Sequence, residues 1–258
     1  MARWMVLTDL EGSFGAARPA VQRLVAAGIP VVPITSKTFA EMRPLADSLG
    51  ISGPIILESG GGIARRVGSS WRMEACGSDT KALRAAAPQI EQRANARLRL
   101  YSAMRLDEAA VASGLTGIEL RRSMQRHFDE PFLLESGVLS DVENAAAAMG
   151  LRIRSGTRFH HLCGTAGIGV AAKRVRDEIA ASFRTEPIVV ALGDAPMDAE
   201  FLAMADIPII IPRPDGTPEP VLIAMVPDAR IAAQSGPRGW ASAIDEVSIT
   251  LAAQVGSA

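Results

Sequence analysis

The chain has 258 residues, a formal net charge of -1 at pH 7 and a hydrophobic content of 48%. This length suits one large domain, or a core that carries an inserted module, and the apolar content is enough for a sizeable core. The near-neutral charge argues against proteins that bind nucleic acid or an anionic membrane surface, because both classes carry a marked basic excess.

The two cysteines, Cys76 and Cys163, show neither the spacing of a metal site nor a paired framework. Such cysteine usage favours a reducing compartment. The N-terminus lacks the pattern of a signal peptide, and no apolar run reaches the length of a membrane span. We therefore expect a cytoplasmic protein without nucleic-acid or membrane partners, and the sequence indicates no oligomeric state.

The first part of the chain alternates strand and helix patterns. Met5, Val6 and Leu7 predict a buried strand that stops at the turn residues Gly12 and Ser13. The patterns that follow predict, in chain order, a helix over 18–27, a strand over 29–34, a helix over 39–49 and a strand over 54–57. This order of strands and helices predicts a parallel sheet.

The pattern changes at about residue 79. Mixed elements follow: helices over 81–94, 107–114, 118–127 and 141–149, and strands over 132–134 and 151–153. Alternation then resumes with a helix over 170–183, a strand over 188–192, a helix over 198–205 and a strand over 207–211. The sequence therefore predicts an α/β core, residues 1–78 and 162–258, with an α+β domain inserted at residues 79–161.

Three of the predicted strands end in polar residues, at the edge where open α/β sheets bind ligands. These residues are Asp9 and Glu11, then Thr35, Ser36 and Lys37, and finally Asp194 and Asp198. Adjacent parallel strands lie ~4.8 Å apart, so these side chains can converge on one site. Carboxylates that meet there repel each other unless a divalent cation binds between them, and such hard oxygen ligands suit Mg²⁺ together with a phosphate oxygen.

A carboxylate at this edge can also attack phosphorus and form an aspartyl-phosphate. The hydroxyl of Thr35 can donate to a phosphate oxygen, and the helix that follows adds backbone N–H groups. Two alternatives stay open. The acids can be solvated strand ends, and Thr35 can be an ordinary helix N-cap.

The segments at these strand ends resemble a known family. Asp9 and Glu11, followed by Gly12 and Ser13, resemble the first motif of the haloacid-dehalogenase superfamily, normally Asp-x-Asp-Gly-Thr. Thr35 matches the second motif, and residues 193–198 resemble the fourth. Five further strings, at 34–38, 57–61, 125–132, 158–161 and 236–240, resemble the mannosyl-3-phosphoglycerate phosphatase family. The resemblance implies a Rossmann-like core and a C2-type cap over 79–161.

The resemblance also implies roles for the residues at the strand ends. Asp9 would be the nucleophile, and Glu11 would protonate the leaving alkoxide and then activate water. A Mg²⁺ ion would be held by Asp9, the backbone carbonyl of Glu11 and Asp194, with Asp198 ligating it or positioning a ligand through water. Thr35 would bind the transferring phosphoryl group.

Further residues are implied as contacts of a phosphorylated small-molecule substrate. Arg126, Arg158 and His161 of the cap would grip the glycerate carboxylate or the sugar, because an Arg fork can bind both carboxylate oxygens. Ser36 is a further candidate substrate contact. The alternative is that the two arginines are surface charges and that His161 is a structural histidine.

The chain departs from the family pattern at its third motif. Ile168 stands where the superfamily has a Lys that neutralises phosphate charge. Loss of one such donor typically costs about 3–4 kcal/mol in the transition state. Lys37 and Lys173 are candidate substitutes, and Lys37 is favoured because it begins a helix at the site. Glu11 replaces an Asp of the pattern, and Met197 and Ser59 each replace an Asn.

The sequence thus predicts a Mg²⁺-dependent phosphatase that hydrolyses a glycosyl-3-phosphoglycerate through an aspartyl-phosphate on Asp9. Ile168 supports one alternative, a degenerate family member that binds a phosphorylated ligand or a partner protein without turnover. A second alternative is a phosphatase or phosphotransferase that acts on a different sugar phosphate.

Overall fold

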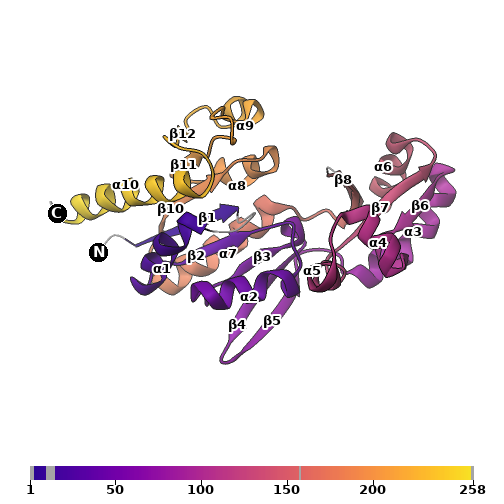
Figure 1. Cartoon of the computed structure of the whole chain (residues 1–258), viewed down its shortest axis with the longest axis horizontal. Coiled ribbons are helices and arrows are strands. Elements are labelled where there is room, and N and C mark those ends of the chain that lie inside the picture. Colours follow the sequence, from indigo (N-terminus) through magenta and orange to yellow (C-terminus); the bar gives the residue numbers. More distant parts are fainter. Residues whose placement is uncertain (1–2, 10–14, 157, 257–258) are drawn as a thin grey trace.

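The computed structural model describes residues 3–9, 15–156 and 158–256. Within these ranges the strands form two sheets, one of eight strands and one of four. Figure 1 shows the four-stranded sheet and its helices lying to one side of the larger sheet. No helix of the described ranges combines the length and the apolar character that a membrane span requires.

The larger sheet has the order β12-β11-β10-β1-β2-β3-β4-β5. Its neighbours from β12 to β3 pair in parallel, whereas β4 and β5 form an antiparallel hairpin at the far edge. The prediction of an α/β fold with a parallel sheet is confirmed. The strands are β1 (Trp4–Asp9), β2 (Val31–Ile34), β3 (Ile55–Leu57), β4 (Gly62–Val67), β5 (Ser70–Ala75), β10 (Ile188–Gly193), β11 (Ile207–Ile210) and β12 (Arg230–Ile231).

Helices cover both faces of this sheet, which explains why β1 is apolar at consecutive positions. Trp4 and Val6 of β1 pack in one core cluster with helices α1 (Arg18–Ala26), α2 (Phe39–Leu49) and α10 (Gly236–Gly256). Met5 and Leu7 point to the opposite face and pack in a second cluster. The helices of that second face are α7 (Ile168–Phe183), α8 (Ala199–Leu202) and α9 (Pro220–Met225).

The smaller sheet is antiparallel, in the order β6-β7-β9-β8, and we call residues 80–164 the insert layer. Its strands are β6 (Arg97–Leu100), β7 (Asp129–Ser136), β8 (Leu151–Ser155) and β9 (His160–Gly164). Helices α3 (Thr80–Ala94) and α6 (Leu139–Ala147) pack with this sheet around Phe132, which is fully buried. A smaller cluster around Tyr101 holds α4 (Leu106–Ser113) and α5 (Gly117–Ser123).

Several predicted bounds were wrong. The helix predicted over 118–127 ends at Ser123. The backbone N–H groups of His127 and Phe128 donate to the carboxylate of Glu58 in the core, so they do not continue the helix. The second sheet extends to Gly164, since β9 pairs with both β7 and β8. The strand at 207–211 is followed by one more, β12.

The β4–β5 hairpin, β6, β9, α9 and α10 were not predicted. Along β5 exposed and half-buried residues alternate, so this edge strand lacks the continuous apolar run that marked the central strands. The division of the chain into a core, residues 1–78 and 162–258, and a cap, residues 79–161, stays a prediction.

Candidate active site

Three carboxylates meet where β1 and β10 end. These strands are neighbours in the sheet, and Thr8 lies opposite Leu192. Asp9 ends β1 and Asp194 follows β10, so the fold brings together two acids that lie far apart in the sequence. With Asp198 they form a group whose carboxylate oxygens all lie within 4.8 Å of one another. The predicted convergence of Asp9, Asp194 and Asp198 is therefore present in the structure.

Local hydrogen bonds fix the third acid. The buried Asp198 lies in a short 3-10 turn, η4 (Pro196–Asp198), and its Oδ2 accepts from the backbone N–H groups of Asp194 and Ala195, at 2.8 and 2.9 Å. Gly193 permits this approach, since a Cβ there would lie 2.6 Å from the Cβ of Asp198. The turn therefore holds both acids at the strand end.

The composition and spacing of this group suit a divalent cation. All its ligand atoms are hard carboxylate oxygens, which is the donor set that Mg²⁺ prefers. Asp194 is exposed and Asp9 is half-buried, so an ion and an oxygen of a substrate can reach both from the cavity described below. Glu11, the predicted acid and base, lies outside the described residues.

The end of β2 supplies the second set of predicted residues. Thr35 is buried, and its hydroxyl accepts a hydrogen bond from the backbone N–H of Lys37 at 3.1 Å. The N-cap of α2 is Thr38, which forms a capping box with Glu41. Thr35 is therefore not the helix cap, and the alternative drawn from the sequence is wrong on this point.

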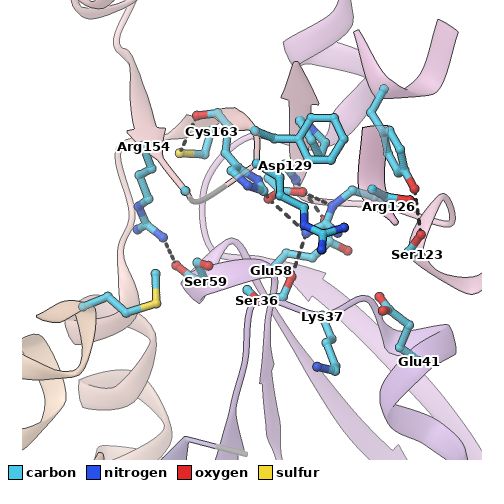
Figure 2. A pocket seen from close by; sticks show the side chains of 18 of the residues that line it. Ser36, Lys37, Glu41, Glu58, Ser59, Ser123, Arg126, Asp129, Arg154 and Cys163 are labelled. Carbon is cyan, nitrogen blue, oxygen red and sulfur yellow. Dashed lines mark hydrogen bonds and ion pairs between the residues drawn. The ribbon is translucent and has the colours of Figure 1, made fainter. Parts of the chain in front are cut away.

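A cavity of about 1210 Å³ lies above these strand ends, and the insert layer forms its other wall (Figure 2). Of the predicted site residues it contains Asp9, Ser36, Lys37, Arg126, Arg158, His161 and Asp194. Thr35 and Asp198 are not part of its lining. The cations in the wall are Lys37, Arg122, Arg126, Arg154 and Arg158. The acidic strand ends and these basic side chains therefore line the same cavity.

A buried charge network joins the insert layer to the core, and the motifs of the sequence did not predict it. Glu58 follows β3 in a 3-10 turn, η2 (Glu58–Gly60), and has a φ of 50°. Its Oε2 accepts from the backbone N–H groups of Phe128 at 2.8 Å and Asp129 at 3.0 Å. Its Oε1 accepts from the N–H of His127 at 3.0 Å. One carboxylate of the core thus holds the start of β7.

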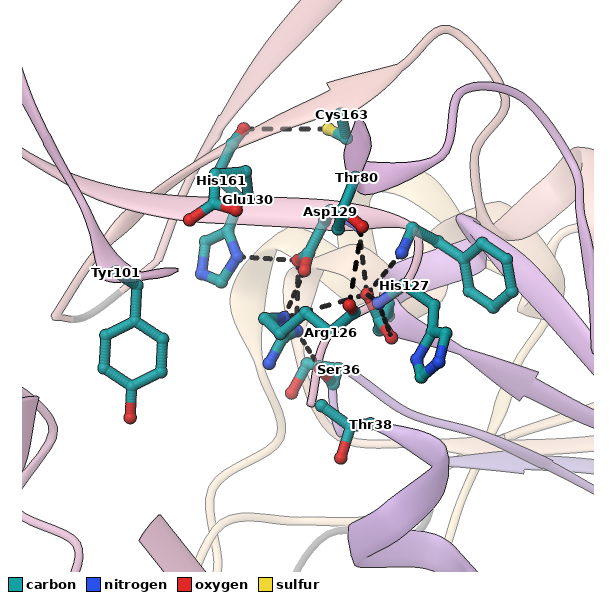
Figure 3. Close-up of polar contacts among 12 residues, drawn as sticks. Ser36, Thr38, Thr80, Tyr101, Arg126, His127, Asp129, Glu130, His161 and Cys163 are labelled. Carbon is teal, nitrogen blue, oxygen red and sulfur yellow. Dashed lines mark hydrogen bonds and ion pairs between the residues drawn. The ribbon is translucent and has the colours of Figure 1, made fainter. Parts of the chain in front are cut away.

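Arg126 and His161 complete this network (Figure 3). The Arg126 guanidinium donates through Nε and Nη2 to the Asp129 carboxylate and through Nη2 to the carbonyl of Ser36, at 2.7 Å. His161 Nδ1 lies 2.8 Å from Asp129 Oδ2. Both predicted substrate contacts therefore have protein partners, although both still line the cavity. Arg158 lines the cavity as an exposed side chain.

The pKa values of the two carboxyls in this network shift in opposite directions. Burial is the main influence on Glu58 and raises its pKa to about 7, although Arg126 and the backbone N–H groups oppose this. Burial also disfavours the charge of Asp129, but Arg126 and His161 outweigh it and lower the pKa of Asp129 to about 2. Asp129 is thus the acid that stays charged beside Arg126.

Ile168 has no part in the cavity. It is the first residue of α7, it is buried, and it packs in the core cluster of the second face. Lys173, one of the two candidate substitutes, lies on the exposed side of α7, and its Nζ pairs with Asp177 at 2.5 Å. That candidate was wrong, because the side chain is directed to solvent; Lys37 does line the cavity.

The chain resembles proteins named as phosphatases over nearly its whole length. A glucosyl-3-phosphoglycerate/mannosyl-3-phosphoglycerate phosphatase of Methanococcoides burtonii is 28% identical over 268 residues, which cover 93% of this chain and 95% of the relative. A protein of the same name from Persephonella marina is 29% identical over 261 residues, with the same coverage. No protein-family model matches the chain.

The fold can be compared with solved structures. A sugar phosphatase of haloacid-dehalogenase subclass IIB superposes with a TM-score of 0.64 at 14% identity, over 95% of this chain and 99% of that one. The chain has the haloacid-dehalogenase fold. The resemblance stated from the motifs is confirmed, and the relatives together with this structure support a phosphatase.

Proposed function

We propose that this haloacid-dehalogenase-type protein is a Mg²⁺-dependent phosphatase whose substrate is a glycosyl-3-phosphoglycerate. The observation that carries the proposal is the meeting of the Asp9, Asp194 and Asp198 carboxylates within 4.8 Å, beside a cavity with five basic side chains. Relatives named for glucosyl- and mannosyl-3-phosphoglycerate support this substrate class.

In the proposed reaction, a carboxylate oxygen of Asp9 attacks phosphorus and the bond from phosphorus to the ester oxygen breaks. Glu11 gives a proton to the leaving oxygen, so the glycosyl-glycerate departs as an alcohol. Water then attacks the phosphorus of the aspartyl-phosphate while Glu11 takes up its proton. Orthophosphate leaves, and Asp9 and Glu11 return to their starting states.

The residues that would hold Mg²⁺ are Asp9, Asp194 and the backbone carbonyl of Glu11, with Asp198 ligating or orienting a ligand through water. The ion, when bound, would neutralise part of the charge on the phosphoryl oxygens. Asp198 is suited to orienting because two backbone N–H groups fix its carboxylate. Thr35 would bind the phosphoryl group through its neighbouring backbone, since its own side chain is buried.

The wall of the cavity supports a substrate with a second negative group. Arg158 from the insert layer lines the cavity with His161, whose Nδ1 is oriented by Asp129. We infer that these residues contact the glycerate carboxylate or the sugar, with Ser36 as a further contact. Arg126 would act on the substrate mainly through Asp129, because its guanidinium already bonds to Asp129 and Ser36.

A second candidate function is ligand binding without turnover. The observation in its favour is the buried Ile168, which cannot donate to a phosphate. A third candidate is hydrolysis of a different sugar phosphate by the same residues.

Phosphate release separates these candidates. Purified protein is incubated with mannosyl-3-phosphoglycerate, with glucosyl-3-phosphoglycerate and with glucose 6-phosphate, each with MgCl₂ and with EDTA. We expect release from the phosphoglycerates with MgCl₂ and none with EDTA. Release from glucose 6-phosphate alone would favour the third candidate. Binding of the phosphoglycerates without any release would favour the second.

A further inference from the structure

None of the five cations that line the cavity belongs to α7, although the third motif of the resembled family has a Lys at the start of this helix. The helix begins at Ile168, and its N-cap, Gly167, offers no side-chain hydrogen bond. The turn η2 packs directly against this helix end, because a Cβ on Gly60 would overlap the backbone of Gly167 and Ile168. Any cation that replaces the missing one has to arrive from another element.

Arg154 of β8 brings a guanidinium to this place. Its Nη1 donates to the carbonyl oxygen of Ser59 in η2, and the N–H of Ser59 in turn donates to the carbonyl of Thr35 at 2.9 Å. The point where a Cβ on Gly167 would stand lies 3.2 Å from the Nη2 of Arg154 and 2.4 Å from the Nη2 of Arg152, so both guanidinium groups reach the start of α7, but of the two only Arg154 lines the cavity. Figure 2 shows Arg154 reaching down to Ser59, across the pocket from Glu41 and Ser123. The side chain lines the same cavity as Asp9 and Asp194.

The guanidinium of Arg154 is incompletely paired. Among the described residues, Arg152 and Arg154 are the two whose Nη2 atom is buried without a hydrogen-bond partner. A buried charged donor without an acceptor is costly, and a bound anion would satisfy it. Burial is also the main cause that lowers the pKa of Arg154, and an adjacent anion would oppose that effect.

We propose that Arg154 contacts the transferring phosphoryl group and supplies the charge that Ile168 cannot. The inference rests on the proposed function, and it makes Arg154 a catalytic residue that belongs to the insert layer. The charge that stabilises the reaction then reaches the strand ends only when this layer is seated on the core. A planar guanidinium suits this role because it can offer two parallel donors to phosphate oxygens.

Arg152 provides a matched control. It lies two residues away on β8, so its side chain leaves the same face of the strand, and its Nη2 is also buried without a partner in the described part of the chain. Its Nε donates to the carbonyl of Gly164 at 3.2 Å, and it does not line the cavity. Lys37, which lines the cavity, is the rival source of charge.

The experiment compares Arg154→Met, Arg152→Met, Lys37→Met and the double variant Arg154→Met with Ile168→Lys. The small ester p-nitrophenyl phosphate is used because it carries no glycerate carboxylate or sugar for an arginine to grip. We expect Arg154→Met to lower kcat about 100- to 1,000-fold, the usual effect of removing one charge-stabilising donor. The kcat of Arg152→Met should stay within about threefold of the wild-type value. The double variant Arg154→Met with Ile168→Lys should have a kcat at least about tenfold higher than Arg154→Met alone.

A binding measurement keeps the inference separate from the proposed function. Titration calorimetry with orthovanadate and MgCl₂ should show affinity about tenfold or more weaker in Arg154→Met than in Arg152→Met. If wild type hydrolyses no ester but this difference is present, the proposed function fails and only the contact of Arg154 with a phosphate-like anion stands. If wild type is active and Arg154→Met matches it in both turnover and vanadate affinity, the role of Arg154 is overturned. A full loss in Lys37→Met with none in Arg154→Met would overturn it as well.

Discussion

Glu58 shows how one residue of the core can hold the insert layer. Its carboxylate is buried and accepts hydrogen bonds from three successive backbone N–H groups, those of His127, Phe128 and Asp129. The positive φ of Glu58 directs the side chain to these groups. Such a conformation is uncommon for a residue with a Cβ, and the surrounding contacts stabilise it.

The pKa of Glu58 leads to a pH-dependent stability. Because its folded pKa, about 7, lies above the ordinary glutamate value of 4.5, its contribution is complete below about pH 4.5 and is lost as the pH rises towards 7. The neighbouring Arg126, Asp129 and His161 are present in both proteins that are compared. The stability of wild type relative to Glu58→Gln should therefore fall across this interval, by about 3 kcal/mol at most. Urea denaturation of both proteins at several pH values measures it, and a difference that stays constant or grows would refute the assignment.

Local sequence signals identified only part of the site. Asp9 and Asp194 were predictable because the first ends an apolar strand and the second directly follows one, and parallel strands end at one edge of the sheet. Glu58 and Asp129 were not, because their importance depends on contacts between segments 71 residues apart. Arg154 was missed for the same reason, since only the placement of β8 on η2 brings it to Ser59.

At the scale of elements, the contact between η2 and α7 depends on glycine. Gly60 has a φ of 87°, and a Cβ there would overlap the backbone of Gly167. Gly68, in the turn of the β4–β5 hairpin, also has a positive φ, of 61°, but a Cβ there would meet nothing within 4 Å. The two glycines therefore separate the cost of backbone strain from the cost of a clash.

We expect Gly60→Ala to lower the free energy of unfolding by about 3 kcal/mol or more, since it adds overpacking to backbone strain. Gly68→Ala should cost about 1 kcal/mol, because only the backbone conformation is disfavoured. Urea denaturation of the two variants makes the comparison. Equal losses in both would show that η2 and α7 can separate without cost.

The fold was more predictable than the site, for reasons that particular elements illustrate. The helix over 39–49 was predicted with its observed bounds, because Thr38 caps it and Gly50 ends it in the left-handed conformation. The strands β1 and β10 were evident because helices bury both of their faces. The helix α10 was missed, since it begins among Gly236, Pro237 and Gly239, which indicate a turn.

At the scale of the whole molecule, two layers enclose one cavity and a buried charge network joins them. Arg126 lies in the insert layer and bonds to Ser36 of the core, while Glu58 of the core bonds to the start of β7. The acids at the strand ends and the basic groups of the insert layer therefore face the same chamber. The position of the insert layer relative to the core therefore decides whether the acids and the basic groups can contact the same ligand.

Removal of Arg126 should weaken this connection strongly. Arg126→Met leaves the buried Asp129 without its guanidinium partner, and we expect a loss of about 3–5 kcal/mol in the free energy of unfolding. Arg23→Met is a suitable control, because its ion pair with Asp245 is solvent-exposed, and it should cost less than about 1 kcal/mol. Thermal or urea unfolding gives both values, and a similar small loss in the two variants would contradict the role of the network.

The most direct measurement is phosphate release from mannosyl- and glucosyl-3-phosphoglycerate by wild type, Asp9→Asn and Asp245→Asn in the presence of MgCl₂. Asp245 is exposed and pairs with Arg23 on the surface, so its change controls for the loss of one carboxylate charge. We predict that Asp9→Asn abolishes turnover because an amide cannot attack phosphorus as a carboxylate does. Asp245→Asn should match wild type. Release of phosphate by Asp9→Asn at the wild-type rate would contradict a reaction centred on Asp9.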